Sequence, residues 1–159
     1  MKLHFAIFTL ITSISLSVFG QTPKQTTMNL KTLTPNLIVE DVNKTVEFYK
    51  RTLGFEVVMT VPESGVFDFA MLKLDNVTIM LQSRKGYVEA LPEYKDQEIG
   101  GTIFLYFEVA DLNKIYDRVK KANAEIVVDI NTTFYGTREF TMKDCDGYLL
   151  IFAEEAKKE

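Results

Sequence analysis

The strongest constraint on the fold of this chain is a segment that occurs twice. The sequence VEDVNKTVEFYKRTLGFEVV begins at Val39, and the related sequence VADLNKIYDRVKKANAEIVV begins 70 residues later, at Val109. Each copy has the pattern of a strand, a helix that begins after an aspartate, and a second strand. A duplicated unit of this kind predicts two similar modules with a concave site between their sheets.

The first 20 residues have the features of a secretory signal peptide. Lys2 precedes an apolar run from Phe5 to Leu16, and Gly20 ends the segment just before polar Gln21. A transmembrane anchor is the alternative, but the run is interrupted by Thr and Ser and is shorter than the roughly 20 apolar residues that span a bilayer. We therefore expect residues 1–20 to be cleaved and the mature protein to be exported, periplasmic or secreted, without a membrane anchor.

The composition excludes several kinds of site. His4 is the only histidine and lies in the predicted signal peptide, so the mature protein would have no Ser-His-Asp or Cys-His arrangement and no histidine-bound metal. Cys145 is the only cysteine, which excludes an intramolecular disulfide. The net charge is −4, and no cluster of Lys and Arg is interleaved with aromatic residues, so nucleic acid is not an expected partner.

The periodicity predicts a flexible leader over residues 21–32 and one α+β domain over residues 33–155. We expect the domain to consist of two tandem modules, 33–84 and 102–155, each with a strand, a helix and three further strands (βαβββ).

A connecting loop, residues 85–101, joins the modules and contains Pro92 and the pair Gly100-Gly101. We expect a short helix near Val88 to Glu93. The loop either crosses the mouth of the site or is a solvated linker.

Four motifs occur in a fixed order along the domain. They are N-L-x-V-x-D (Asn36, Leu37, Val39, Asp41), F-Y-x-x-x-L-G-F (Phe48, Tyr49, Leu53, Gly54, Phe55), Y-G-x-R (Tyr135, Gly136, Arg138) and D-x-D-G (Asp144, Asp146, Gly147). This set resembles the vicinal oxygen chelate superfamily, which includes glyoxalase I, extradiol dioxygenases and bleomycin resistance proteins. The resemblance implies paired βαβββ modules around a cup, commonly in a homodimer.

The resemblance also implies where a metal would bind in metal-using members. The four ligand positions fall on Thr34, Met80, Phe104 and Ile151. None is a histidine or a carboxylate, and three have no oxygen or nitrogen in the side chain. We therefore expect no metal and no other cofactor, which makes the metal-free branch, with its drug-binding and resistance proteins, the closer match.

Side chains alternate across a strand, so every second residue from these positions would face the cup. We expect the ligand-binding residues to be Asn36, Phe69, Met80, Gln82, Arg84, Phe104, Tyr106, Glu108, Arg138 and Ile151. The arginines would pair with an anionic group or stack on a ring, or else form structural ion pairs. The intervening apolar residues of the same strands would pack on the helices.

A lining of aromatic, Met and amide side chains is typical of a cleft for a flat or amphipathic organic molecule. The leading hypothesis is a homodimeric protein that binds or sequesters a small organic ligand without a metal. A second is a lyase, isomerase or dioxygenase of this superfamily that uses a non-standard metal site or acid-base residues. A third is an interaction module whose cup is filled by its own side chains.

Overall fold

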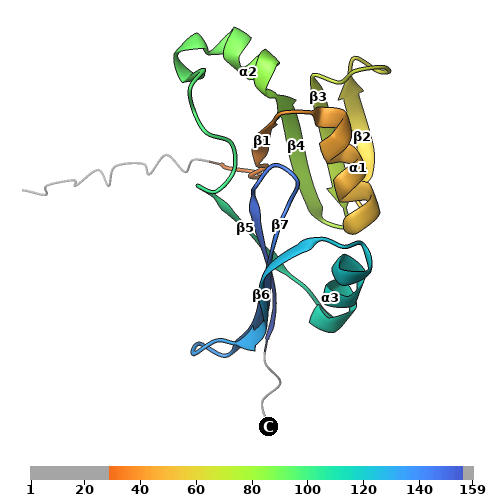
Figure 1. Ribbon diagram of the computed structural model, residues 1–159, viewed down its shortest axis with the longest axis vertical. Helices are drawn as coiled ribbons and strands as arrows, with labels where there is room; N and C mark the ends of the chain where they lie inside the picture. The colour runs from red at the N-terminus through yellow and green to blue at the C-terminus, as the bar shows by residue number, and fades with distance from the viewer. Residues whose placement is uncertain (1–28, 156–159) are drawn as a thin grey trace, which may run out of the picture. The chain divides into compact units, whose positions relative to one another are not determined.

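The computed structural model describes residues 29–155, so the predicted signal peptide and most of the leader lie outside the described residues. Contacts divide the chain into Met1–Lys31 and a compact unit, Thr32–Glu159. The fold of the compact unit is α+β, with two four-stranded mixed sheets and three α-helices (Figure 1). Within the described range, no helix has the length and hydropathy needed to cross a bilayer.

The first module forms one sheet with the strand order β1-β4-β3-β2. Its elements are β1 (Asn36–Val39), α1 (Val42–Thr52), β2 (Glu56–Val61), β3 (Phe69–Leu74) and β4 (Val77–Ser83). The second module repeats this order as β5-β8-β7-β6. Its elements are β5 (Phe104–Glu108), α3 (Leu112–Lys121), β6 (Glu125–Thr132), β7 (Thr137–Lys143) and β8 (Leu149–Glu155). In both sheets the first strand is parallel to the last and the other neighbours are antiparallel.

The repeated aspartates begin the two module helices in the same way. The Asp41 carboxylate accepts a hydrogen bond from the Lys44 amide at 3.0 Å, and the Asp111 carboxylate accepts one from the Lys114 amide at 3.0 Å. These bonds satisfy amides that have no partner inside the first helical turn. The predicted caps are confirmed, and they explain why Asp recurs in the two copies.

Each helix covers one face of its own sheet. The covered faces carry the apolar residues that alternation assigned to the helices, and Leu37, Val39, Ile79, Leu81 and Leu105 are all buried. These side chains belong to one core that includes residues of both modules. Among residues 29–155, the opposite face of each sheet is not covered by α1 or α3, and this open face holds most of the predicted ligand-binding residues.

The modules are joined by polar contacts at one turn and between their helices. The Tyr49 hydroxyl on α1 donates to the buried Asp144 carboxylate at 2.9 Å, and the Tyr148 hydroxyl donates to the Ile38 carbonyl at 2.9 Å. The Arg118 guanidinium on α3 donates to the Thr52 carbonyl at the end of α1, at 2.9 Å. The D-x-D-G motif therefore holds the second module against the first.

The connecting loop contains more helix than expected. Helix α2 spans Arg84–Ala90, begins directly after β4 and is capped by the Ser83 hydroxyl, and the short 3-10 helix η1 (Pro92–Tyr94) follows. The helix expected near Val88 to Glu93 begins earlier than predicted, because the Ser83 side chain caps a helix that follows β4 without a break. We use the name strap for residues 84–103.

Candidate functional site

The open face of the first sheet is mostly apolar. Strand register places its residues in two rows that run across all four strands. The first row is Asn36, Met80, Met71 and Met59, and the second is Ile38, Gln82, Phe69 and Val61. At the edge of the sheet, the Asn36 amide donates to the Gln82 amide oxygen at 2.9 Å. The predicted residues Asn36, Phe69, Met80 and Gln82 therefore lie together on one surface.

The open face of the second sheet is more polar. Its rows begin at the three alternate residues of β5 that were predicted to bind ligand. They are Phe104 with Leu149 and Lys143, Tyr106 with Ile151 and Thr141, and Glu108 with Ala153 and Glu139. The structure thus places Phe104, Tyr106, Glu108 and Ile151 side by side.

Glu139 is the centre of a hydroxyl cluster on this face. One of its carboxylate oxygens accepts hydrogen bonds from the hydroxyls of Thr137 at 2.7 Å, Tyr135 at 3.0 Å and Tyr106 at 3.2 Å. Partial desolvation of the phenol and its bond to Glu139 raise the pKa of Tyr106. Tyr106 therefore stays protonated at neutral pH and acts as a hydrogen-bond donor.

Two hollows lie along this face. One of about 550 Å³ is lined by Tyr106, Glu108, Thr137, Ala153 and Glu155, among others. A second, of about 600 Å³, is lined by Phe104, Tyr106 and Glu108 from β5 and by Val77 and Thr78 from β4. Both volumes are in the range of small-molecule sites. Because residues of both open faces line the second hollow, the two faces adjoin.

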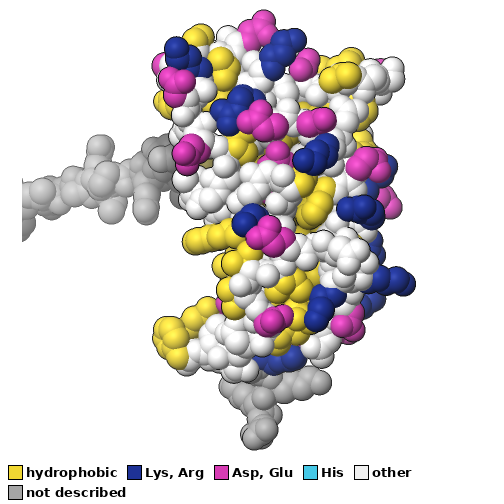
Figure 2. Space-filling view, in the orientation of Figure 1, with side chains coloured by type: hydrophobic (Ala, Val, Ile, Leu, Met, Phe, Trp, Pro, Cys, Tyr) yellow, Lys and Arg dark blue, Asp and Glu magenta, His cyan; other side chains and the backbone are white. Residues whose placement is uncertain are grey.

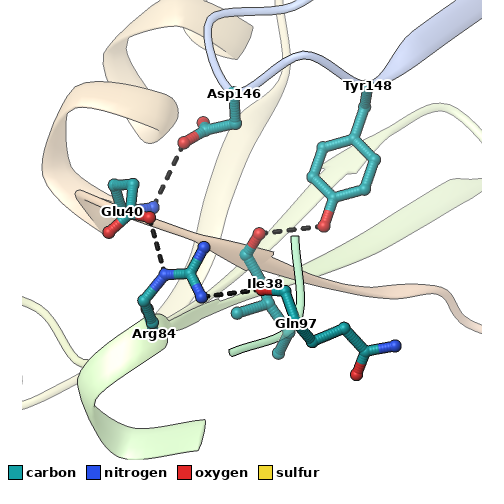
Figure 3. A network of polar contacts seen from close by, with 6 residues as sticks. All are labelled: Ile38, Glu40, Arg84, Gln97, Asp146 and Tyr148. Carbon is teal, nitrogen blue, oxygen red and sulfur yellow. Dashed lines mark hydrogen bonds and ion pairs between the residues drawn. The ribbon is translucent and has the colours of Figure 1, made fainter. Parts of the chain in front are cut away.

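The strap forms the wall of a third hollow, of about 330 Å³, beside β1. Figure 3 shows how it is held: the Arg84 guanidinium donates to Glu40 at 2.6 Å and to the Gln97 carbonyl at 2.8 Å, and the Glu40 amide donates to Asp146 at 3.2 Å. Arg84 is thus engaged in the structural ion pair that the sequence left as an alternative.

Arg138 is not on the open face, which corrects the expectation from sequence. Its guanidinium is paired with Glu154 and donates to the Asn113 side chain of α3 at 3.1 Å, on the helix-bearing side of the sheet. Alternation along β7 places buried Phe140 and Met142 on that same side and leaves Glu139 on the open face.

Sequence reasoning missed Glu139, Thr137 and Tyr135 as members of the site. The apolar residues Phe140 and Met142 could have identified the strand residues among them. Independently of the Y-G-x-R motif, these two residues indicate which side chains of β7 face the core, and the alternate side chains then lie on the open face.

The four positions that bind metal in metal-using members of the vicinal oxygen chelate superfamily do not suit a metal in this chain. Met80, Phe104 and Ile151 offer no oxygen or nitrogen, which leaves the Thr34 hydroxyl alone. Among residues 29–155, no three His, Cys, Asp or Glu side chains are placed to hold one ion. The donor set of this site therefore does not fit a catalytic metal.

Comparison with known proteins gives one family. A model of the "Glyoxalase/Bleomycin resistance protein/Dioxygenase superfamily" matches residues 30–152. The protein YraH of Bacillus subtilis is 33% identical over 91 residues, which cover 55% of this chain and 69% of YraH. The protein Mb0911c of Mycobacterium bovis is 24% identical over 118 residues, which cover 73% of this chain and 78% of that protein.

Solved structures show the same fold. A glyoxalase/bleomycin resistance protein/dioxygenase from Nocardioides superimposes with a TM-score of 0.68 at 18% identity, covering 84% of this chain and 89% of that one. TioX from Micromonospora sp. ML1 has a TM-score of 0.63 at 21% identity, covering 79% of this chain and 99% of TioX. At these identities the likeness concerns the fold alone.

Proposed function

We propose that this chain, which belongs to the glyoxalase/bleomycin resistance protein/dioxygenase superfamily, binds a small organic ligand on the open faces of its two sheets without using a metal. The observation that carries this proposal is a surface with two parts. A Met- and Phe-bearing apolar area adjoins a carboxylate that three hydroxyls orient. Burial of apolar atoms supplies affinity, and a few fixed polar groups set orientation.

The charge of the open face narrows the class of ligand. The second sheet presents Glu108, Glu139 and Glu155 there, and its lysine on that face, Lys143, is paired with Glu125 at 2.6 Å. Both arginines once expected to meet an anion are engaged elsewhere. We therefore expect a neutral or cationic aromatic ligand and weak binding of anionic analogues.

Binding is tested by screening neutral, cationic and anionic aromatic compounds by thermal shift and measuring the hits by calorimetry. Glu139→Gln should weaken a cationic hit about tenfold, because a charge-assisted contact is lost. Tyr116→Phe is the matched control, since Tyr116 also donates to a carboxylate, Asp129, but from α3. Equal loss in both variants, or preference for anions, would contradict the proposal.

The metal-free part of the proposal has its own test. The purified protein is incubated with Mn²⁺, Fe²⁺, Ni²⁺ or Zn²⁺, and metal per subunit is measured after gel filtration. We expect substoichiometric, weak binding, because the four superfamily positions supply one hydroxyl. Tight binding of one ion per subunit would overturn it.

Export is proposed from the signal-like residues 1–20. Expression of the full chain in a bacterium, followed by fractionation and intact-mass measurement, should give an exported product that begins at Gln21. Retention at full length in the cytoplasm would contradict export.

An enzymatic function is the second candidate, favoured by the Tyr106–Glu139–Tyr135 cluster, in which phenols and a carboxylate lie within hydrogen-bond distance for proton transfer. Its test is turnover of a panel of small dicarbonyl and catechol compounds, with Glu139→Gln and Glu108→Gln as variants. Turnover that falls at least about a hundredfold in one variant, without loss of folding, supports an acid-base role.

A further inference from the structure

The two module helices are rich in positive charge. Together α1 and α3 carry seven Lys or Arg and two acidic residues among their 21 residues, although the whole chain has a net charge of −4. Figure 2 shows Lys and Arg side chains over both helices. Basic residues therefore gather on the helix-bearing side of the sheets, whereas the open faces carry carboxylates such as Glu108 and Glu139.

The repeat places cations at equivalent positions of the two helices. The offset of 70 residues relates Lys44 to Lys114 and Arg51 to Lys121. Within each helix the two positions are about two turns apart, so both side chains lie on the same side of the helix with roughly 10 Å between them. Arg118 lies between Lys114 and Lys121 on that side of α3, and all five side chains are exposed. We use the name basic stripe for Lys44, Arg51, Lys114, Arg118 and Lys121.

The basic stripe continues from one module to the other. The Arg118 guanidinium donates through Nε to the carbonyl of Thr52, the residue after Arg51, at 2.9 Å. A Cβ at Gly54 would lie 2.9 Å from Nη2 of Arg118, so the guanidinium packs closely on this glycine. Arg118 is thus held in place at the end of α1 by one of its nitrogens, and the parts of the stripe on α1 and on α3 meet there.

Within residues 29–155, no cation of the basic stripe is in an ion pair. The ion pairs of this region use Lys50, Arg84, Arg138 and Lys143. The Nη groups of Arg118 and the ammonium groups of the three lysines therefore keep their donors for an anion from outside the chain.

The stability of the helices does not account for Lys44 and Lys114. Each is the third residue of its helix, after the caps Asp41 and Asp111. At this end the helix dipole is positive, so a cation is unfavourable and an acidic residue is preferred. A bound anion would offset this unfavourable charge in both modules.

A hollow of about 370 Å³ lies along the part of the basic stripe on α1. It is lined by Lys44, Glu47, Phe48, Arg51 and Cys145. The Glu47 carboxylate is bound to Lys50 at 2.8 Å, which leaves Lys44 and Arg51 as the free charges on either side of half-buried Phe48. An aromatic ring between two cations suits a sugar that bears a carboxylate, because the C–H face of the sugar packs on the ring and the acid pairs with a cation.

We propose that the basic stripe binds a linear acidic polysaccharide. A sugar ring of the polymer packs on Phe48, and successive acidic groups pair with the cations of α1 and α3. This site lies on the opposite side of the sheets from the open faces, so it is separate from the ligand site of the proposed function. The choice of a polymer found outside the cytoplasm rests on the proposed export.

Two other polyanions fit the basic stripe less well. No residue of α1 or α3 is among the exposed large hydrophobic side chains of residues 29–155, so neither helix offers an apolar face for insertion into a bilayer. An anionic membrane would also bring a chain of net charge −4 close to a negative plane. Single-stranded nucleic acid binds by stacking several bases on aromatic rings, and the stripe offers one half-buried ring.

The proposal is tested with oligogalacturonate, a linear chain of galacturonic acid, whose binding to the purified protein is measured by calorimetry over a range of salt concentrations. Uncharged dextran is the control polymer. If each contact contributes roughly 0.7 to the slope of log K against log salt concentration, five contacts give a slope of about −3 to −4. No binding of oligogalacturonate at low salt would overturn the proposal.

The variant Lys44→Gln/Lys114→Gln/Lys121→Gln removes three exposed charges and leaves Arg118 bonded to α1. Affinity for oligogalacturonate should fall at least about tenfold at low salt, and the salt slope should become shallower by about two. The two substitutions at the helix starts should not lower the melting temperature, because they remove a cation from the positive end of each helix. A lower melting temperature would mean that these lysines have a structural role and would contradict the proposal.

The matched control variant is Lys73→Gln/Lys85→Gln/Lys95→Gln, which makes the same change in net charge at exposed positions of β3 and the strap. It should bind oligogalacturonate with nearly the affinity of the wild type. Equal loss in the two triple variants, or tighter binding of duplex DNA or phosphatidylglycerol vesicles than of oligogalacturonate, would rule out the assigned partner. If the polymer binds as expected and no aromatic compound does, the basic stripe stands and the proposed function fails.

Discussion

Asp144 is a carboxylate that the fold buries almost completely, and its surroundings explain why this is tolerated. Its two oxygens accept hydrogen bonds from the Tyr49 hydroxyl and from the amides of Asp146 and Tyr148, all at 2.9 Å. Burial raises the pKa of Asp144 above the usual carboxyl value, although these three bonds oppose the shift. Burial of the Asp144 carboxylate costs free energy, and its bond to Tyr49 is one of the polar contacts that join the two modules.

The raised pKa of Asp144 predicts a pH dependence of stability. The folded state binds a proton to this group more readily than the unfolded state, so its contribution to the free energy of unfolding is largest below the usual carboxyl pKa and declines as pH rises through the raised value. Asp144→Asn keeps an oxygen that accepts from the Asp146 and Tyr148 amides, places an NH2 donor towards the Tyr49 hydroxyl, which would then accept, and does not titrate. Urea unfolding between pH 3.5 and 7.5 should therefore show the stability of wild type falling relative to the variant as pH rises. A constant difference would contradict the assignment.

Cys145 should be an unreactive thiol in the folded protein. Burial, followed by the nearby charge of Asp146, raises the pKa of this thiol to about 12. Only the thiolate reacts with alkylating reagents, so iodoacetamide at pH 8 should label the folded protein about a hundredfold or more slowly than the urea-unfolded protein. Similar rates in the two states would show that the turn opens readily.

At the scale of elements, the strap depends on one close backbone approach. A Cβ at Gly100 would lie 2.7 Å from the Asp146 carbonyl oxygen and 2.7 Å from the Gly147 carbonyl carbon. The neighbouring Gly101 has a similar positive φ, +70° against +74°, but open space around it. Substitutions at Gly100 and Gly101 therefore distinguish the effect of a steric clash with the turn from the effect of backbone strain.

Gly100→Ala should therefore destabilise the protein more than Gly101→Ala does. Both changes incur the strain of a left-handed residue, and only Gly100→Ala also pushes the strap off the Asp146-Gly147 turn, which adds about 2 kcal/mol. The measurement is the free energy of unfolding in urea for the two variants. Equal destabilisation would mean that the strap does not rest on the turn.

The elements also show where prediction from sequence succeeds. The helix after Asp41 and the strand Val77–Ser83 were predicted correctly, because a local cap and strict alternation determine them. The prediction of which β7 side chains face the cup was wrong. It followed the Y-G-x-R motif, whereas the buried side chains of Phe140 and Met142 determine which residues of β7 face the helix. An ion pair between Arg138 and Glu154 joins residues 16 positions apart, and local sequence does not encode such a contact.

At the scale of the molecule, the two modules share one core, although each has its own sheet. Leu150 of β8 is fully buried in this core, together with Leu72 and Ile79 of the first module. The arrangement predicts that the compact unit unfolds as a single cooperative body and not module by module.

Leu150→Ala tests this cooperativity. The variant should lose about 2–5 kcal/mol of stability, and the most protected amides of β3 and β4 should lose protection by the same free energy as those of β8. Hydrogen exchange measured by mass spectrometry of peptides from each module gives the comparison. Loss of protection confined to the second module would mean that the modules unfold separately.

Repetition, capping residues and alternation in the sequence determined the α+β class, the two modules and the helix-covered faces of the strands, because these depend on contacts within a few residues or on a period of two. Residue identity alone also shows that the four superfamily metal positions hold no histidine or carboxylate. Tertiary structure decided the rest. Only the tertiary structure shows that Arg138 lies away from the open face, that three hydroxyls donate to Glu139 and that the open faces of the two sheets adjoin. Each of these depends on contacts between segments that come together only when the chain folds.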